Sequence, residues 1–116
     1  MRIEDVAGNR VMFVEDDGAP LSTPEAVSDL IGNAWFDHID VVALPVARID
    51  PRFFDLSSTF AGQFAQKAVN FQVKVAVIGD VSEQHSDAFR DFVRESNRGR
   101  HIWFVADEAA LAARLA

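Results

Sequence analysis

The sequence predicts an α/β domain with the element order β-β-α-β-α-β-α-β-α and a mixed, mostly parallel sheet flanked by helices. Three observations predict this class. Residues 41–44 and 73–78 are almost continuously apolar, as is typical of parallel strands that are buried on both faces. Amphipathic stretches with helical spacing separate these runs along the chain. Strands that alternate with helices favour right-handed crossovers and therefore a largely parallel sheet.

The first elements of the chain are predicted to be a hairpin. Residues 2–6 and 10–15 are strand-like, and Gly8-Asn9 between them predicts the hairpin turn. This hairpin adds an antiparallel edge to the sheet. Asp16-Asp17-Gly18 predicts a turn after the second strand, because two adjacent acids without the spaced ligands of a calcium loop are typical of a turn.

The first helix is predicted to begin after Thr23, which offers a capping hydroxyl, with Pro24 at the first helical position. A strand over residues 41–44, stopped by Pro45, follows it. The apolar positions with helical spacing predict that one face of this first helix is buried, comprising Val27, Leu30, Ile31, Ala34 and Trp35.

The second helix is predicted to begin near Ser57 or Ser58, one of which would cap it. Residues 73–78 then form the next strand, which Gly79-Asp80 ends. The expected apolar stripe of the second helix comprises Phe60, Ala61, Phe64, Ala65, Ala68 and Val69.

The C-terminal elements are a third helix, a last strand and a short final helix. Ser86 is expected to cap the third helix and Gly99 to end it. Residues 101–105 predict the last strand, and Asp107 is expected to cap the final, alanine-rich helix. The inward face of the third helix is predicted to comprise Phe89, Phe92 and Val93.

Length, charge and composition limit the class of function. A chain of 116 residues forms one domain, residues 1–116, and its formal charge of −7 argues against nucleic acid as the main partner. No apolar run approaches the roughly 20 residues that cross a bilayer, and the first residues lack a signal-peptide pattern, so we expect a cytoplasmic protein without a membrane partner. Cysteine is absent, the three histidines lack ligand spacing, and no cofactor motif is present. We expect neither a metal nor a cofactor.

The order of the elements is similar to that of the STAS domain (sulfate transporter and anti-sigma-factor antagonist) over about the whole length, so residues 1–116 are expected to form a single STAS-like domain. The resemblance implies a phosphorylatable serine at the start of the second helix, within Asp-Ser-Ser/Thr-Gly. This chain has Asp55-Leu56-Ser57-Ser58-Thr59 in the corresponding place, with Leu56 inserted and no following glycine.

A combination of short motifs between residues 41 and 115 is more specific. The motifs are Phe53-Phe54-Asp55-Leu56-Ser57, Ala61-Gly62, Gln66-Lys67, Asn70, Ile78-Gly79-Asp80, and Phe92 with Glu95-Ser96-Asn97-Arg98-Gly99-Arg100. Together they resemble an uncharacterised bacterial family, domain of unknown function 4180. In that family glycine is more usual at Thr59, glutamate at Gln63 and tyrosine at Phe71. The family has no established activity, so the resemblance implies a domain type and no mechanism.

A candidate switch or ligand site is expected at the carboxyl ends of the parallel strands, where open α/β sheets bind ligands. It comprises Asp55, Ser57, Ser58, Thr59 and Asp80. One hypothesis is a small regulatory or protein-interaction domain controlled by phosphorylation of Ser57 or Ser58, because a phosphate there would interact with the helix dipole and with nearby carboxylates. The alternative, a small-ligand binder or enzyme, would use Asp55 and Asp80. Helix capping and turn formation account for the same residues without any function.

A second candidate is an interaction surface on the outward face of the second helix, extended to the end of the third. It comprises Gln63, Gln66, Lys67, Asn70, Glu95, Asn97 and Arg98. An ordinary solvated helix face is the simpler interpretation of these residues. The expected partner is another protein or a second copy of the chain, since ten phenylalanines and two tryptophans could include an aromatic-rich dimer face. An enzyme is the less favoured hypothesis, because no acid, base or nucleophile is convincingly paired.

Overall fold

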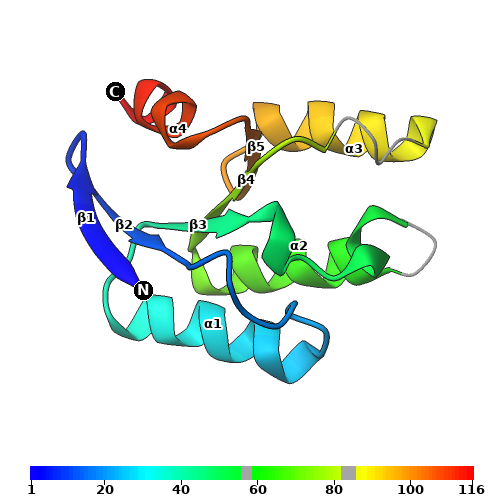
Figure 1. Cartoon of the computed structure of the whole chain (residues 1–116), viewed down its shortest axis with the longest axis horizontal. Helices are drawn as coiled ribbons and strands as arrows, with labels where there is room; N and C mark the ends of the chain where they lie inside the picture. The colour runs from blue at the N-terminus through cyan, green and yellow to red at the C-terminus, as the bar shows by residue number, and fades with distance from the viewer. Residues whose placement is uncertain (56–58, 82–85) are drawn as a thin grey trace.

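The computed structural model describes residues 1–55, 59–81 and 86–116, and it confirms the predicted α/β class (Figure 1). One five-stranded sheet has the spatial order β1-β2-β3-β4-β5, in which β1 is antiparallel to β2 and the other neighbouring pairs are parallel. The strands are β1 (Arg2–Val6), β2 (Asn9–Phe13), β3 (Val41–Pro45), β4 (Lys74–Ile78) and β5 (Ile102–Val105). The helices are α1 (Pro24–Phe36), α2 (Phe60–Phe71), α3 (Asp87–Arg98) and α4 (Glu108–Leu115), with 3-10 turns η1 (Val46–Arg48) and η2 (Pro51–Phe54) after β3.

The two faces of the sheet are covered unequally. Each parallel connection moves to the next strand in the same direction, so right-handed crossovers place α1, α2 and α3 on one face. Figure 1 shows α3 and α4 on either side of β5. Alternating residues of that strand point to these two layers: Phe104 packs in the core under α1 to α3, and Trp103 packs with Leu111 of α4.

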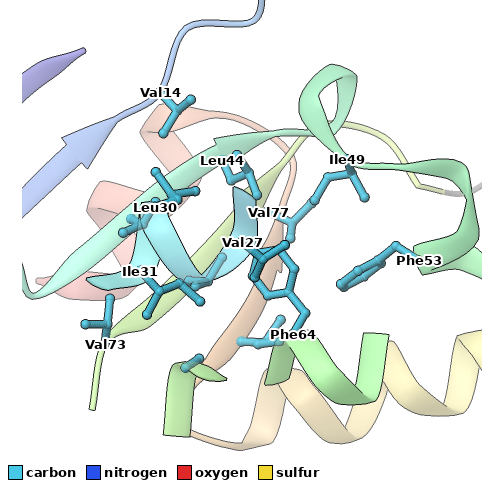
Figure 2. Close-up of a cluster of buried hydrophobic side chains, with 14 of the residues drawn as sticks. Val14, Val27, Leu30, Ile31, Leu44, Ile49, Phe53, Phe64, Val73 and Val77 are labelled. Carbon is cyan, nitrogen blue, oxygen red and sulfur yellow. The ribbon is translucent and has the colours of Figure 1, made fainter. Parts of the chain in front are cut away.

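Phe53 of η2 joins several elements within the larger core (Figure 2). Its side chain is fully buried. Its ring centroid lies 5.6 Å from that of Phe64 in α2 and 6.2 Å from that of Phe104 in β5, in aromatic-pair range. The rings of Phe54, Phe89 and Phe92 also lie within 6.5 Å of it. Phe53 therefore ties the chain that follows β3 to α2, α3 and the sheet.

The predicted hairpin is confirmed, but its turn is one residue earlier than expected. Ala7 and Gly8 have φ values of 52° and 83°, the left-handed pair that a two-residue hairpin turn requires. Asn9 is already the first residue of β2, and its side-chain amide donates hydrogen bonds to the carbonyls of Val6 and Ala7 at 3.3 Å. The asparagine therefore stabilises the turn from outside it.

Three of the four predicted helix starts are confirmed by side-chain hydrogen bonds. Thr23 Oγ1 accepts from the backbone N–H of Ala26 at 3.1 Å, and Asp107 Oδ1 accepts from that of Ala110 at 2.8 Å. Ser86 caps α3 in the same way, and Gly99 ends that helix as predicted. No helix in the described part of the chain has the length and apolar character that spanning a bilayer requires.

Two predicted core positions are exposed. Trp35 is 57% exposed and Val69 is 42% exposed. Each residue comes one position after the buried residues of its helix, so its side chain is rotated away from the sheet. Trp35 instead lies beside Phe71 at the end of α2, with ring centroids 6.1 Å apart. The outer surface of α1 and α2 is therefore more apolar than the sequence pattern predicted.

Candidate functional site

The carboxyl edge of the sheet carries the carboxylates that the sequence singled out. Asp55 directly follows η2, Asp80 follows Gly79 at the end of β4, and both side chains are exposed. Ser57 and Ser58 lie outside the described residues, so the predicted phosphorylation site stays a prediction. The ligand-binding role of Asp55 and Asp80 stays a hypothesis as well.

The N-terminus of α2 differs from the expected one. The helix begins at Phe60, and its N-cap is Thr59 rather than Ser57 or Ser58. Thr59 has φ 63° and ψ 1°, and its side chain makes no capping hydrogen bond. The left-handed conformation is the reason: it turns the hydroxyl away from the first helical N–H groups, and Thr59 Oγ1 instead accepts from Gln63 Nε2 at 3.2 Å. A β-branched residue is strained in this conformation, which glycine adopts freely.

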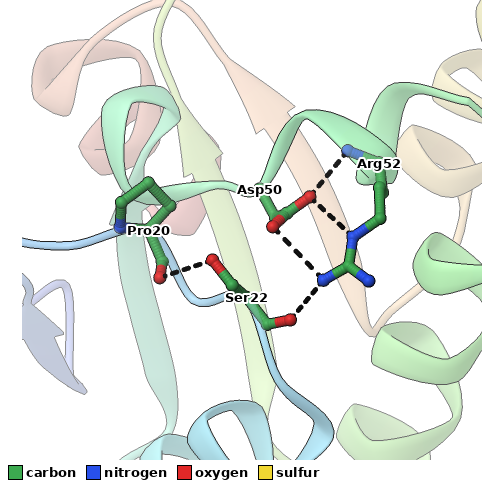
Figure 3. A network of polar contacts seen from close by, with 4 residues as sticks. All are labelled: Pro20, Ser22, Asp50 and Arg52. Atoms are coloured by element: carbon green, nitrogen blue, oxygen red, sulfur yellow. Dashed lines mark hydrogen bonds and ion pairs between the residues drawn. The ribbon is translucent and has the colours of Figure 1, made fainter.

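A buried carboxylate fixes the loops beside this edge (Figure 3). Asp50 is 8% exposed and caps η2, its Oδ1 accepting from the backbone N–H of Arg52 at 2.8 Å and from Arg52 Nε at 3.0 Å. The same guanidinium donates through Nη2 to the carbonyl of Ser22, just before α1. These bonds from Arg52, first its guanidinium and then its backbone N–H, lower the pKa of Asp50 to about 2. We call Ser22, Asp50 and Arg52 the Asp50 network.

The Asp50 network and a parallel bridge between Leu21 and Ile49 hold the loop before α1 against the chain before α2. The backbone N–H of Leu21 also donates to the carbonyl of Arg48 at 2.9 Å. The N-terminal end of α1 is therefore tied to η2, and Arg52 Cζ also lies 5.0 Å from the ring centroid of Phe60 at the start of α2.

A groove of about 350 Å³ lies between α1 and α2. Its size is at the lower end of the range of small-ligand sites, and it is open to the surface. The described residues that line it are Pro24, Val27, Phe60, Gln63, Phe64, Gln66, Lys67 and Asn70. Gln63, Gln66, Lys67 and Asn70 belong to the surface that the sequence predicted, and the structure brings these four together. We call this feature the α1–α2 groove.

The walls of the groove combine apolar and amide groups. Pro24, Val27, Phe60 and Phe64 supply apolar surface. Gln66 Nε2 donates to Asn70 Oδ1 at 2.9 Å. The amide oxygen of Gln66 and the amide nitrogen of Asn70 are not used in that bond, and neither bonds another described residue. Both an acceptor oxygen and amide N–H donors therefore remain available on these two groove residues.

Lys67 is the one charged residue among the described residues that line the groove. It forms no ion pair with a carboxylate in the described ranges of the chain. The groove is therefore a local cationic position on a protein whose formal net charge is −7. A bound molecule with an apolar part and a negative charge would complement it.

The part of the surface predicted on α3 is separate. Glu95 and Arg98 are exposed there, and neither lines the α1–α2 groove. Asn97 has a structural contact, because its Oδ1 accepts from the backbone N–H of Phe104 at 2.7 Å and so joins α3 to β5. The structure thus divides the predicted surface into the α2 residues and the end of α3.

The apolar walls of the groove were not predicted as site residues. Val27, Phe60 and Phe64 have the spacing of core residues, and each is indeed less than 9% exposed. A sequence pattern does not distinguish a buried side chain that touches only protein from one that also lines a groove. Pro24 was identified only as a helix start.

A family model described as Domain of unknown function (DUF4180) matches residues 6–115. No curated protein and no solved structure matches the chain.

Proposed function

The chain belongs to the DUF4180 family, and we propose that it is a protein-interaction domain that binds a short peptide segment of a partner in the α1–α2 groove. The family membership confirms the resemblance of the motifs between residues 41 and 115, while the similarity to STAS domains stays a prediction. The observation that supports the proposal is the groove itself, lined by Gln63, Gln66, Lys67 and Asn70.

The amide pair at the groove favours a peptide. A peptide unit offers one N–H donor and one carbonyl acceptor, which match the amide oxygen of Gln66 and the amide nitrogen of Asn70. Exchange of the oxygen and nitrogen positions in both amides would still leave an amide oxygen as acceptor and an amide nitrogen as donor. A simple carboxylate ligand would need donors only, so it would leave the acceptor without a use.

The surface beyond the groove also favours a protein over a small molecule. Trp35 and Val69 are exposed near the C-terminal ends of the same two helices, and Phe36, which follows Trp35, is 75% exposed. A molecule that fills about 350 Å³ does not cover these side chains as well. Exposed aromatic side chains are typical anchors of protein interfaces. We therefore place the apolar anchor of the peptide in the groove and its acidic residue beside Lys67.

A peptide-display selection against the immobilised protein tests this proposal. We expect enrichment of sequences that combine a large apolar residue with Asp or Glu. In fluorescence-anisotropy titrations, Lys67→Gln should lower the affinity for the selected peptide about tenfold, because roughly one charge-assisted hydrogen bond is lost. Asn70→Ala should lower the affinity for the peptide by a smaller factor. Arg90→Gln removes a positive charge from α3, outside the groove, and is the matched control.

Three outcomes would overturn the proposal. One is that no sequence is enriched. Another is that selected peptides bind Lys67→Gln and Asn70→Ala as tightly as the wild type. The third is that light scattering shows a dimer that no selected peptide dissociates and that both variants weaken, which would assign the groove to a second copy of the chain.

Regulation of this groove from Ser57 or Ser58 is a finer proposal. Phe60, which lines the groove, follows Ser58 by two residues. A phosphate so close in sequence would add negative charge near the expected position of an acidic peptide and repel it. We expect Ser57→Asp or Ser58→Asp to weaken peptide binding and to leave the urea midpoint unchanged. Unchanged peptide affinity in both variants would exclude this regulation.

A further inference from the structure

A group of positive charges lies on the opposite face of the sheet, around Trp103. Lys74 is the first residue of β4, two positions before Ala76, which pairs with Trp103. Side chains two positions apart on a strand share a face, so Lys74 and Trp103 both lie on the face that α4 covers. Lys74 Nζ is 3.8 Å from the indole centroid.

The third member of this arrangement comes from α4. Arg114 is in the last turn of that helix, and its Cζ lies 4.0 Å from the same indole centroid. Two cations therefore contact one ring. Arg100 lies between Gly99, whose carbonyl accepts from Trp103 Nε1 at 2.9 Å, and His101, whose carbonyl accepts from the backbone N–H of Val75 at 2.7 Å. Its backbone is therefore beside both Trp103 and the start of β4. The pKa of Lys74 is lowered by burial first and then by the charges of Arg114 and Arg100.

No carboxylate in the described part of the chain forms an ion pair with these three cations. The sequence has 18 acidic residues for 11 Lys and Arg, so acids are in excess. Of the other eight Lys and Arg residues, Arg2, Arg52, Arg90 and Arg94 form an ion pair with a described carboxylate, and Arg10, Arg48, Lys67 and Arg98 do not. The repulsion among Lys74, Arg100 and Arg114 is therefore not compensated by the described carboxylates.

Contacts within the protein stabilise part of this cluster. Arg114 Nη2 donates to the carbonyl of Asn97, and Trp103 Nε1 donates to that of Gly99 at 2.9 Å, so both side chains bond carbonyls at the end of α3. A helix C-terminus has a partial negative charge of roughly one half, which compensates only a fraction of three full charges. Cation–π contacts with Trp103 stabilise Lys74 and Arg114, but they do not neutralise them.

We propose that Lys74, Arg100 and Arg114 bind a phosphate group. Two guanidinium groups and one ammonium offer donors in several directions, which suits an oxyanion with three or more accessible oxygens. The indole N–H is already bonded to Gly99, so Trp103 serves as the surface on which the cations are arranged rather than as a ligand. The site is on the face opposite the α1–α2 groove and does not depend on the peptide proposal.

Trp103 offers a direct measurement. The chain has two tryptophans, so Trp35→Phe leaves Trp103 as the sole indole, and Trp35 is exposed enough to be replaced without loss of the fold. In this background we expect inorganic phosphate to change Trp103 fluorescence saturably at constant ionic strength. Lys74→Gln should raise the apparent Kd about tenfold. Arg100→Gln changes an exposed residue and should raise the apparent Kd to a similar extent. Arg90→Gln removes one positive charge elsewhere and is the control.

A phosphate monoester, glycerol 3-phosphate, is titrated in parallel. Tighter binding of the monoester than of inorganic phosphate would assign the site to a small organic phosphate, and equal or weaker binding would assign it to free phosphate. Two results would overturn the proposal: sodium chloride of equal ionic strength produces the same response, or Lys74→Gln and Arg100→Gln both bind phosphate with unchanged affinity.

Discussion

Replacement of Phe53 by alanine tests the architecture on which both proposed sites depend. The side chain is fully buried and its ring lies within 6.5 Å of five other phenylalanine rings. Truncation of a buried phenylalanine costs about 3–5 kcal/mol, and the number of ring partners places Phe53→Ala near the upper end of that range. For 116 residues, an unfolding entropy of about 0.24 kcal/mol/K converts 4–5 kcal/mol into a decrease in Tm of roughly 17–21 °C.

Urea unfolding followed by far-UV circular dichroism measures the change. A domain of this size has a total stability of about 5–15 kcal/mol, so Phe53→Ala can be mostly unfolded in a less stable background. Phe53→Leu keeps most of the apolar volume and is expected to lose about 1–2 kcal/mol, which remains measurable.

Phe36→Ala is the matched control, because Phe36 is the same residue type with 75% of its surface exposed. Phe36→Ala should change the free energy of unfolding by no more than about 0.5 kcal/mol. The reasoning is refuted if Phe53→Ala and Phe36→Ala have the same urea midpoint, or if Phe53→Leu is neutral.

Three further predictions concern the edge of the sheet. The folded-state pKa of Asp50 is about 2, below its ordinary value of 3.8, so its stabilising contribution is complete above about pH 5 and is lost as the pH falls toward 2. Asp50→Asn should unfold at a lower urea concentration than the wild type at pH 7, by a difference that narrows between pH 5 and pH 2, and a difference that stays constant over this range would contradict this. Gly79 has φ 137°, and a Cβ there would lie 2.8 Å from Val46 Cγ2. Gly79→Ala should lower the free energy of unfolding in urea by about 2–3 kcal/mol, and Val46→Ala should restore only part of this loss. An unchanged free energy of unfolding in Gly79→Ala would show that the backbone is not strained. Thr59→Gly should raise the free energy of unfolding by roughly 0.5–1 kcal/mol, because relief of the left-handed strain exceeds the entropic cost of glycine. A lower melting temperature of this variant would contradict the left-handed conformation of Thr59.

The order of the elements could be predicted because it depends on patterns that are local in sequence. The continuous apolar runs at residues 41–44 and 73–78 became the buried strands β3 and β4. Thr23, Ser86 and Asp107 capped their helices because a hydroxyl or carboxylate before a helix satisfies N–H groups within three residues.

The start of α2 could not be predicted because backbone geometry decided it. Thr59 has a left-handed conformation and the helix begins after it, and hydroxyl groups alone contain no information on φ. Trp35 was wrongly assigned to the core for a related reason: the helical period places it at the edge of the buried arc, and only the position of α2 determines on which side of that edge it lies.

The candidate site was predictable in part. The polar side of the α1–α2 groove follows from helical periodicity, since Gln63, Gln66, Lys67 and Asn70 share one face of α2. The apolar side required the packing of α1 on α2, to which Pro24 and Val27 contribute. The cation cluster joins Lys74, Arg100 and Arg114 from three separate segments, so no local pattern indicates it.

The position at which a selected peptide binds tests the central claim most directly. Backbone amide chemical shifts of the labelled protein, recorded during titration with that peptide, report the contact surface residue by residue. We expect the largest changes at Val27 and along α2 from Gln63 to Asn70. Changes concentrated at Asp55 and Asp80, or around Trp103 on the opposite face, with the α1–α2 groove unaffected, would contradict a peptide-binding function for the groove.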